Sequence, residues 1–378
     1  MKRSVWVRHG WARGWAAGVF AFAGLFLLAL WLSPPTGAGA GVPSGTLVAH
    51  FIDVGQGDAT LLAGPDFTIM IDAGRHDRND VVPYLESAGV ERIDLLIGTH
   101  PHADHIGQFP QVLQRFPVAE VWLPGTLTTT RTFERALDAI LASNAAYHEP
   151  RAGEVFHLGS ARLEVLNPAQ VTQDINGDSI AVRVVFGEIA ILFTGDAEAP
   201  TEREILDRGG TLRSDILQVG HHGSRTSSTT VFLQAVQPAL AVYSAAKGND
   251  YGHPHPETLE RFAALGIPLL GTETYGTIIV ETDGHTWTLR TEQGGAGPLL
   301  QDPNGGGEPG CAPGQVDVNS APLELLVTIR HIGPERAEEL IRLRPFATLD
   351  ELTRIPGIGP ARLDDIREQG LACVGPAG

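Results

Sequence analysis

The segment Thr99–His105 limits the possible folds more than any other feature of this sequence. Three histidines and one aspartate fall within six residues, directly after an apolar run: His100, His102, Asp104 and His105. The apolar run, IDLLIG (93–98), predicts a buried strand with these side chains on the loop at its end. Imidazole and carboxylate groups together suit zinc, manganese or iron. Because alternating residues of an extended loop point in different directions, the segment can serve two metal ions.

Short β-rich runs and helical stretches alternate around this segment. Strands are expected at residues 47–54, 59–64, 67–74, 93–100, 161–168, 180–187, 188–196, 215–223, 239–245, 277–284 and 285–291. Helices are expected at residues 80–89 and 202–209. Strands paired with single helices favour two mixed sheets covered by helices on the outside, an α/β sandwich. Residues 46–291 would form this domain.

The first 45 residues predict a signal peptide or a membrane anchor with a spacer. Four basic residues precede the uncharged run 14–32: Lys2, Arg3, Arg8 and Arg13. As a helix, the run would reach roughly 28 Å, close to the hydrocarbon thickness of a bilayer. Positive charge ahead of an apolar run sends the rest of the chain across the membrane. The small residues 38–40 (Ala-Gly-Ala) fit a signal-peptidase site, so a cleaved signal and a retained anchor both stay open. Either predicts an extracytoplasmic protein, secreted or anchored through residues 14–32.

The sequence predicts a linker followed by a small helical domain in the C-terminal part of the chain. Residues 292–314 are rich in Gly and Pro and have no apolar period, which is typical of a linker. In residues 315–378, helices are expected at 321–329, 335–343, 349–355 and 361–369. Cys311 and Cys373 flank this domain, and in an exported protein such a pair closes into a disulfide. Two unrelated free thiols are the alternative.

The charge of the chain bears on its partners. The formal net charge is −17, with 43% hydrophobic and 19% charged residues, a globular composition. A protein that depends on long-range attraction to nucleic acid is usually basic. The charge therefore argues against a pure DNA-binding module. Any recognition of phosphate groups would be local, through metal ions or backbone amides.

Five separated motifs resemble the metallo-β-lactamase superfamily and, within it, the extracellular nuclease domain of ComEC-type DNA-uptake proteins. They are FIDVGQGDAT (51–60), THPHADHIG (99–107), LFTGDAE (192–198), VGHHGSRTSS (219–228) and NDYGHPHP (249–256). The resemblance covers about residues 47–291. It implies a four-layer αββα sandwich that holds two divalent metal ions, zinc or manganese. No nucleotide cofactor is expected.

The resemblance implies a role for each residue of the metal site. His100 and His102 would hold one ion, while Asp104, His105 and one histidine of the pair 221–222 would hold the other. Asp196 would bridge the two ions. His222 is favoured as the ligand, with His221 contacting substrate or transferring a proton, and the reverse assignment stays open.

Further residues would act around the metal ions. Asp104, His221 and His253 are the candidate catalytic groups, whereas His255 is expected at the surface. Candidate substrate-binding residues are Ser224, Ser228 and Asn249, with an ordinary turn role open for the serines. Asp53, Gln56, Asp58 and Asp72 would orient the ligands by accepting the second N–H of each imidazole.

One stretch departs from the wider superfamily. Many of its hydrolases carry another metal-binding histidine before the strand that leads to the bridging aspartate. Here the corresponding stretch is DINGDSIAV (174–182), which has no histidine and resembles the Asn…Ser pattern of the ComEC-like group. Asn176, Asp178 or water could complete the coordination. The ion at His100 and His102 would then be held more weakly, which favours an oxygen-tolerant ion such as manganese.

The implied reaction is hydrolysis of phosphodiesters, with single- or double-stranded DNA as the leading substrate. Two divalent ions can share a water molecule and lower its pKa from ~15.7 to about 7, which supplies an attacking hydroxide. His221 or His253 could protonate the leaving group. A small phosphodiester, a lactone or a β-lactam is an alternative substrate, because fold alone does not choose. A DNA receptor with an inert hydrolase domain is a third possibility.

The tail contains a segment that resembles a helix-hairpin-helix motif of competence DNA receptors. The segment is IPGIGPAR (355–362), and an earlier copy, IRHIGPER (329–336), has His331 in place of the first glycine. Gly357, Gly359 and Arg362 would contact the DNA backbone, since glycines allow close approach and helix N-termini bind phosphate. Residues 315–378 hold seven arginines and ten acidic residues, so a structural or protein-binding role is the alternative.

Overall fold

The computed structural model describes residues 45–293, 311, 315–346 and 348–374. Of the signal or anchor segment expected at 1–45, residues 1–44 lie outside the described residues, as does the greater part of the expected linker. Among those that are described, no helix is both long and apolar enough to cross a membrane.

Two mixed β-sheets form the centre of the domain that carries the motifs. The first sheet has the spatial order β15 (Trp287–Thr291), β14 (Ile278–Thr282), β1 (Leu47–Phe51), β2 (Thr60–Ala63), β3 (Thr68–Ile71), β4 (Ile93–Ile97), β5 (Val118–Trp122) and β6 (Ala146–His148). The second sheet has the order β13 (Leu269–Gly271), β12 (Leu240–Tyr243), β11 (Ile216–Gln218), β10 (Ile189–Phe193), β9 (Ala181–Phe186), β8 (Ala161–Asn167) and β7 (Val155–Leu158).

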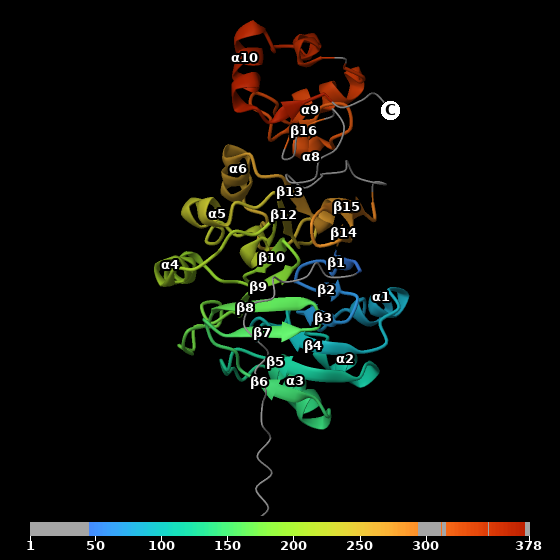
Figure 1. Cartoon of the computed structure of the whole chain (residues 1–378), viewed down its shortest axis with the longest axis vertical. Helices are drawn as coiled ribbons and strands as arrows, with labels where there is room; N and C mark the ends of the chain where they lie inside the picture. The colour runs from blue at the N-terminus through green and yellow to red at the C-terminus, as the bar shows by residue number, and fades with distance from the viewer. Residues whose placement is uncertain (1–44, 294–310, 312–314, 347, 375–378) are drawn as a thin grey trace, which may run out of the picture. The chain divides into compact units, whose positions relative to one another are not determined.

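Helices cover the outer face of each sheet. The first sheet is flanked by α1 (Val81–Ser87), α2 (Phe109–Arg115) and α3 (Arg131–Ala142). The second sheet is flanked by α4 (Ala199–Arg208), α5 (Thr230–Val236) and α6 (Pro256–Leu265), while the short α7 (Thr272–Tyr275) follows β13. Figure 1 shows α1 and α2 beside the first sheet and α4, α5 and α6 beside the second. The order of layers is helix, sheet, sheet, helix, as predicted.

The alternation of side chains along the strands explains these layers. On β3, Ile69 and Ile71 point to the core between the sheets, whereas Met70 points to the core under α1, α2 and α3. Successive strand residues face opposite sides of a sheet, so a strand buried on both faces is apolar throughout. Between the sheets, Phe51 of β1 and Phe193 of β10 stack with ring centroids 6.3 Å apart. Each sheet therefore contributes to two hydrophobic layers.

The strand directions bring the predicted motifs to one edge of the two sheets. In the first sheet β3 and β4 are parallel, and in the second β10, β11 and β12 are parallel. Each chemistry-bearing segment begins just after the carboxyl end of one of these strands or of β1. Loops far apart in the sequence therefore converge, which is where open α/β sheets commonly form their sites.

The tail consists mainly of short helices. It contains α8 (Leu323–Leu326), α9 (Pro334–Leu343), the 3₁₀ helix η2 (Leu349–Arg354) and α10 (Pro360–Gln369). The expected all-α fold gains one feature: β16 (Val316–Asp317) pairs in parallel with β17 (Ala372–Cys373). Cys311 and Cys373 form a disulfide with their Cα atoms 5.3 Å apart. The start and the end of the tail are thus joined by both the strand pair and the disulfide.

Candidate metal centre

The loop that follows β4 presents the predicted histidines through a chain of buried hydrogen bonds. Asp72, at the end of β3, accepts hydrogen bonds from the backbone N–H and the hydroxyl of Thr99, both at 2.8 Å. Its Oδ2 also accepts from Nδ1 of His105 at 2.8 Å. Nδ1 of His100 lies 3.1 Å from the Thr99 hydroxyl. Because these bonds occupy Nδ1, both rings turn Nε2 toward the inside of the site.

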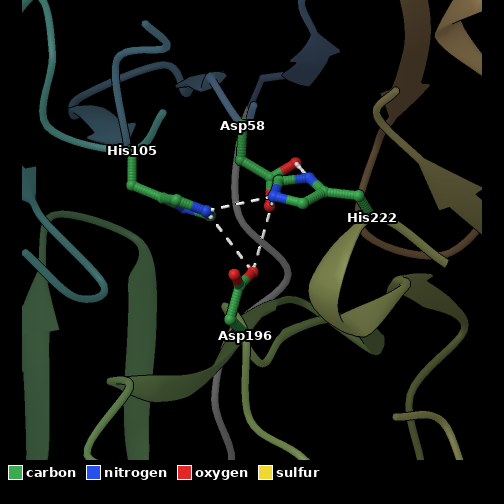
Figure 2. A group of neighbouring side chains, drawn as sticks. All are labelled: Asp58, His105, Asp196 and His222. Atoms are coloured by element: carbon green, nitrogen blue, oxygen red, sulfur yellow. Dashed lines mark hydrogen bonds and ion pairs between the residues drawn. The ribbon is translucent and has the colours of Figure 1, made fainter. Parts of the chain in front are cut away.

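Four buried side chains from four separate loops form the first candidate metal group: Asp58, His105, Asp196 and His222. Figure 2 shows their rings and carboxylates pointing toward one another. Nε2 of His105 lies 3.4 Å from Oδ1 of Asp196 and 3.3 Å from Nε2 of His222. Nδ1 of His222 faces the carbonyl oxygen of Ser244 at 3.1 Å, so Nε2 of His222 is left for an ion. The predicted ligand Asp104 lies beside this group, with Oδ2 at 3.4 Å from the same Nε2.

The second candidate group contains His100, His102 and again Asp196. Nε2 of His100 lies 2.9 Å from Nδ1 of His102 and 3.5 Å from Oδ2 of Asp196. The two oxygens of Asp196 therefore face different groups, Oδ1 the first and Oδ2 the second. This is the arrangement that a carboxylate bridging two cations requires.

The donor set fits divalent cations. Both carboxylate oxygens of Asp58 and Oδ1 of Asp196 are buried and have no hydrogen-bond partner. Burying an unpaired carboxylate oxygen costs several kcal/mol, so such atoms in a native protein call for a partner. Imidazole nitrogens 3.4–3.7 Å from these carboxylates add the ligand type that zinc and manganese accept.

The carboxylates control the ionisation of the site. Burial by itself lowers the pKa of His105, but the charges of Asp196 and Asp72 outweigh it and raise that pKa well above its usual value. Burial lowers the pKa of His100, and the neighbouring imidazole of His105 lowers it further. Burial raises the pKa of Asp104, yet the imidazoles of His222 and His105 hold it well below its usual range. The buried carboxylates thus favour positive charge beside them, which a bound cation would also supply.

The turn after β11 holds the paired histidines in a strained backbone. His221 and His222 lie in the short 3₁₀ segment η1 (Gly220–Gly223), with φ of 51° and 54°. Non-glycine residues in this left-handed region cost about 1–3 kcal/mol each. His222 is almost fully buried in the first group, whereas His221 is 22% exposed and its Nδ1 faces Glu198 at 3.2 Å. The arrangement favours His222 as a ligand and leaves His221 at the mouth of the site.

His253 lies at the same mouth. Its ring centroid is 5.5 Å from that of His221 and 6.1 Å from that of His222. Burial, followed by the imidazoles of His222 and His221, lowers the pKa of His253 to about 4. Nε2 of Gln56 lies 3.4 Å from its Nδ1. His255 instead accepts a hydrogen bond from the backbone of Arg225.

The three predicted substrate-binding residues are all engaged within the protein. The hydroxyl of Ser224 pairs with that of Thr226 at 2.9 Å. The backbone of Ser228 bonds to Glu202 and Arg261, and its side chain is 2% exposed. Asn249 bonds to the backbone of its own loop. These bonds support the shape of the site, and direct substrate contact by the three residues stays a prediction.

The residues expected to orient the ligands take different positions. Asp72 bonds directly to His105 as described above. Oδ1 of Asp58 lies 3.6 Å from Nδ1 of His222, so Asp58 can either orient that ring or bind a cation itself. Asp53 accepts a hydrogen bond from the backbone of Gly55, which shapes its turn. Sequence reasoning did not single out Thr99 and Glu198, although both belong to the motifs that carry the ligands.

The stretch without a histidine is held by Asp178. Its carboxylate accepts hydrogen bonds from Thr126, from Thr172 and from the backbone of Gln173. Asp178 therefore closes its own loop and belongs to neither metal group among the described residues. Oδ1 of Asn176 is buried and has no hydrogen-bond partner.

The two hairpin turns of the tail share their backbone geometry. Gly357 has a φ of 83°, and His331, its counterpart in the first copy, has a φ of 67°. In each copy an arginine donates to the carbonyl five residues earlier: Arg362 to Gly357 at 2.7 Å, and Arg336 to His331 at 2.9 Å. Nε2 of His331 also pairs with Asp365 at 2.7 Å. The histidine thus adopts the conformation for which the other copy uses glycine.

Comparison with known families identifies both domains. The family described as "Metallo-beta-lactamase superfamily" matches residues 52–247, more than half of the chain, and the helix-hairpin-helix motif matches residues 313–369. The chain belongs to the metallo-β-lactamase superfamily and carries a helix-hairpin-helix domain at its C-terminal end. The predicted family, sandwich fold and tail motif are confirmed.

Relatives with curated names include competence proteins. The chain is 30% identical over 247 residues to ComE operon protein 3 of Bacillus subtilis, covering 60% of this chain and 32% of that protein. It is 32% identical over 244 residues to competence protein ComA of Neisseria gonorrhoeae, covering 63% of this chain and 32% of that protein. A protein named deoxyribonuclease from Thioalkalivibrio sp. is 39% identical over 69 residues, 18% of each chain. The chain thus spans about a third of the length of the two competence relatives.

Among solved structures, the metallo hydrolase Igni18 of Ignicoccus hospitalis matches 62% of this chain and 98% of its own, at 15% identity and a TM-score of 0.44. By its family match, the chain is a metallo-β-lactamase-fold hydrolase with a candidate site for divalent metal, and it is related in sequence to competence proteins.

Proposed function

We propose that this chain is an exported metal-dependent phosphodiesterase that cleaves DNA, in uptake or in degradation of extracellular DNA. The observation that carries the proposal is the pair of donor groups that share Asp196. Bound divalent cations would lower the pKa of a shared water molecule and neutralise charge on a phosphate. The names of the competence relatives and of the deoxyribonuclease support DNA as the substrate.

The chain's own residues would prepare this site in three ways. Asp72, directly and through Thr99, fixes the rings of His105 and His100 with Nε2 turned inward. The carbonyl oxygen of Ser244 holds Nδ1 of His222, so that Nε2 of this ring also turns inward. Such outer partners commonly contribute 10–100-fold to metal affinity. His221, which lies at the mouth of the site beside Glu198, would exchange a proton with a leaving group.

The first test compares His102→Ala and Asp196→Ala with the wild type in Mn²⁺ and in Zn²⁺. Losing a cation removes several kcal/mol of transition-state stabilisation, so DNA cleavage should fall by roughly 100-fold or more. Metal content measured on the same samples should fall as well. His157→Ala, an exposed histidine outside both groups, is the matched control and should retain both.

The choice of substrate separates the proposal from its rivals. Single-stranded DNA, duplex DNA, bis-p-nitrophenyl phosphate, a lactone and nitrocefin should be offered to the same preparation. Cleavage of DNA that depends on Asp196 supports the proposal. Turnover of only the lactone or only nitrocefin would assign a different substrate, and binding of DNA without any hydrolysis would identify an inert receptor.

The tail is proposed to bind the DNA backbone through Gly357, Gly359 and Arg362. The N-terminus of α10 follows Gly359, and added Cβ atoms at this glycine would meet nothing within 4 Å, so the turn is open to a ligand. Reversing the charge with Arg362→Glu should weaken DNA binding by the full chain. Arg342→Glu, which changes an exposed arginine near the C-terminal end of α9, is the control.

A further inference from the structure

The loop that follows β12 forms one wall at the mouth of the metal site. Asn249 fixes this loop, residues 246–253. Its Nδ2 donates to the carbonyl oxygens of Ala246 and His253, and its Oδ1 accepts from the backbone N–H groups of Tyr251 and His253 at 3.1 and 3.0 Å. With four hydrogen bonds from one side chain, the loop holds its shape before any substrate arrives.

Tyr251 presents an aromatic ring from this loop. It is one of the few large apolar side chains that are well exposed in the described residues, at 63%. The ring stacks on His253 with centroids 5.7 Å apart and an angle of 22° between the planes. The ring of His253 lies 6.1 Å from that of the candidate ligand His222, measured between centroids. Only the ring of His253 therefore stands between Tyr251 and this candidate ligand.

Lys247 lies on the same loop. It is the only lysine of the chain after Lys2, in a protein of net charge −17. It is exposed and makes no hydrogen bond or ion pair within the part of the chain that the structure describes. Together with His253, Glu273 and Thr274 it lines a pocket of about 480 Å³ beside the metal site. An unpaired cation at this position suits a phosphate group.

We propose that loop 246–253 is a nucleotide subsite, in which Tyr251 stacks on a nucleobase and Lys247 pairs with a phosphate of the same strand. The inference rests on the proposed function, because it places the subsite beside the phosphodiester to be cleaved. In a duplex both faces of a base are covered by its neighbours, whereas an unstacked base has a face free for an aromatic side chain. The subsite therefore favours a strand with an unpaired base next to the cleaved bond.

The test measures binding by the full-length protein after its metal ions have been removed with a chelator, so catalysis does not enter. Two unlabelled probes compete with a labelled one: a thymidine hexanucleotide and the same backbone with six abasic residues. Stacking on an aromatic side chain contributes about 1–3 kcal/mol per base, which corresponds to roughly 5- to 150-fold in affinity. The wild type should prefer the thymidine probe by a factor in this range.

Variants of Tyr251 identify the ring responsible. Tyr251→Ala should lose most of this preference by binding the thymidine probe more weakly, while its affinity for the abasic probe should match that of the wild type. Tyr251→Phe keeps the ring and should behave like the wild type. Tyr147→Ala, a second exposed tyrosine on β6, is the matched control. Equal losses on both probes, or no loss on either, would overturn the stacking role of Tyr251.

Lys247 is tested by salt dependence. Replacing Lys247 with Ala should weaken both probes alike and reduce the slope of log affinity against log salt by about 0.7, the value for one phosphate contact on a single strand. Lys247→Arg should restore the slope. An unchanged slope in Lys247→Ala would remove the lysine from the subsite.

The two proposals can fail separately. If Tyr251→Ala behaves as expected but no variant of Asp196 affects cleavage, the subsite stands and the proposed hydrolysis is wrong. If Asp196→Ala abolishes DNA cleavage while Tyr251→Ala leaves both probes unaffected, the hydrolase stands and the subsite is wrong.

Discussion

Individual residues of the metal site were largely predictable, because their spacing is unusual. Three histidines and an aspartate in six residues indicated a metal loop, and the resemblance to the metallo-β-lactamase superfamily added Asp196. The structure brings His100, His102 and His105 together with Asp196 in two candidate groups. The place of Asp58 could not be deduced in the same way. Its carboxylate meets His222 only because β1 and β11, in different sheets, end at the same edge. Contacts between distant loops follow from the fold and not from local spacing.

Asp72 should set the affinity of the site for metal. Asp72→Asn would place an amide opposite Nδ1 of His105 and opposite the Thr99 hydroxyl. This change would disturb the orientation of two candidate ligands, His105 directly and His100 through Thr99. The affinity for Zn²⁺ or Mn²⁺, measured by titration calorimetry, should fall by about 10–100-fold. Asp66→Asn, which alters an exposed carboxylate bonded to Ser160, is the control. An affinity within twofold of the wild type would contradict the role of Asp72.

His50 should make stability depend on pH. It is buried on β1 beside the Tyr84 hydroxyl, 2.8 Å away, and burial, with Arg290 adding to it, lowers its pKa from 6.5 to about 4. The folded protein binds this proton less readily than the unfolded chain, so stability is full above pH 6.5 and is lost as the pH falls toward 4. Between pH 7.5 and 5.0, the urea midpoint of the wild type should drop more than that of His50→Gln. Parallel drops would rule His50 out, and His157→Gln, on an exposed histidine of β7, serves as the reference.

At the scale of elements, apolar runs located most strands but not their ends. The run 188–196 predicted a strand up to Asp196, whereas β10 ends at Phe193 and the remaining residues form the turn that aims the carboxylate. Helix α3 was not predicted, although Thr130 caps it and Phe133, Ala136 and Ile140 share its buried face. The parallel pair of β16 and β17 has two residues on each side, which is too short for a periodic signal.

The turn after β10 should tolerate no side chain at Gly195. This residue has a φ of +51°, and a Cβ would lie 2.8 Å from Cβ of Thr99, on the loop that carries His100. Gly195→Ala therefore adds a steric conflict to the conformational cost of about 1–2 kcal/mol. Gly89→Ala, at a φ of +76° with nothing within 4 Å of the added atom, isolates the conformational cost alone. Urea unfolding should show a larger loss of stability for Gly195→Ala, and equal losses would disprove the conflict.

At the scale of the whole molecule, the site joins the two sheets. Asp58 and His105 follow strands of the first sheet, while Asp196 and His222 follow strands of the second. Buried carboxylate oxygens that have no hydrogen-bond partner, those of Asp58 and Oδ1 of Asp196, are costly at this junction unless cations lie between the side chains. Metal binding should therefore stabilise the folded domain as a whole, since the unfolded chain cannot assemble ligands that lie so far apart in sequence.

Removal of metal should lower the thermal midpoint. At a free metal concentration about 100 times the dissociation constant, binding adds about 2.7 kcal/mol to the free energy of unfolding. For a domain of this size, treatment with EDTA should then lower the midpoint by roughly 5 to 10 °C, and restored Mn²⁺ or Zn²⁺ should reverse the change. Asp196→Asn lacks the shared carboxylate and should show little response to EDTA. If EDTA left the thermal midpoint of the wild type unchanged, this result would argue against a bound ion.

The bond between Cys311 and Cys373 makes the route of protein production part of the experiment. It closes a loop of 62 residues, and removing that freedom from the unfolded tail contributes about 4 kcal/mol. Glutathione and thioredoxin in the bacterial cytosol keep such thiols reduced. A cytosolic preparation would carry an open, less stable tail, whereas secretion into an oxidising periplasm would yield the closed form. Assays of DNA binding on the two preparations would therefore describe two different molecules.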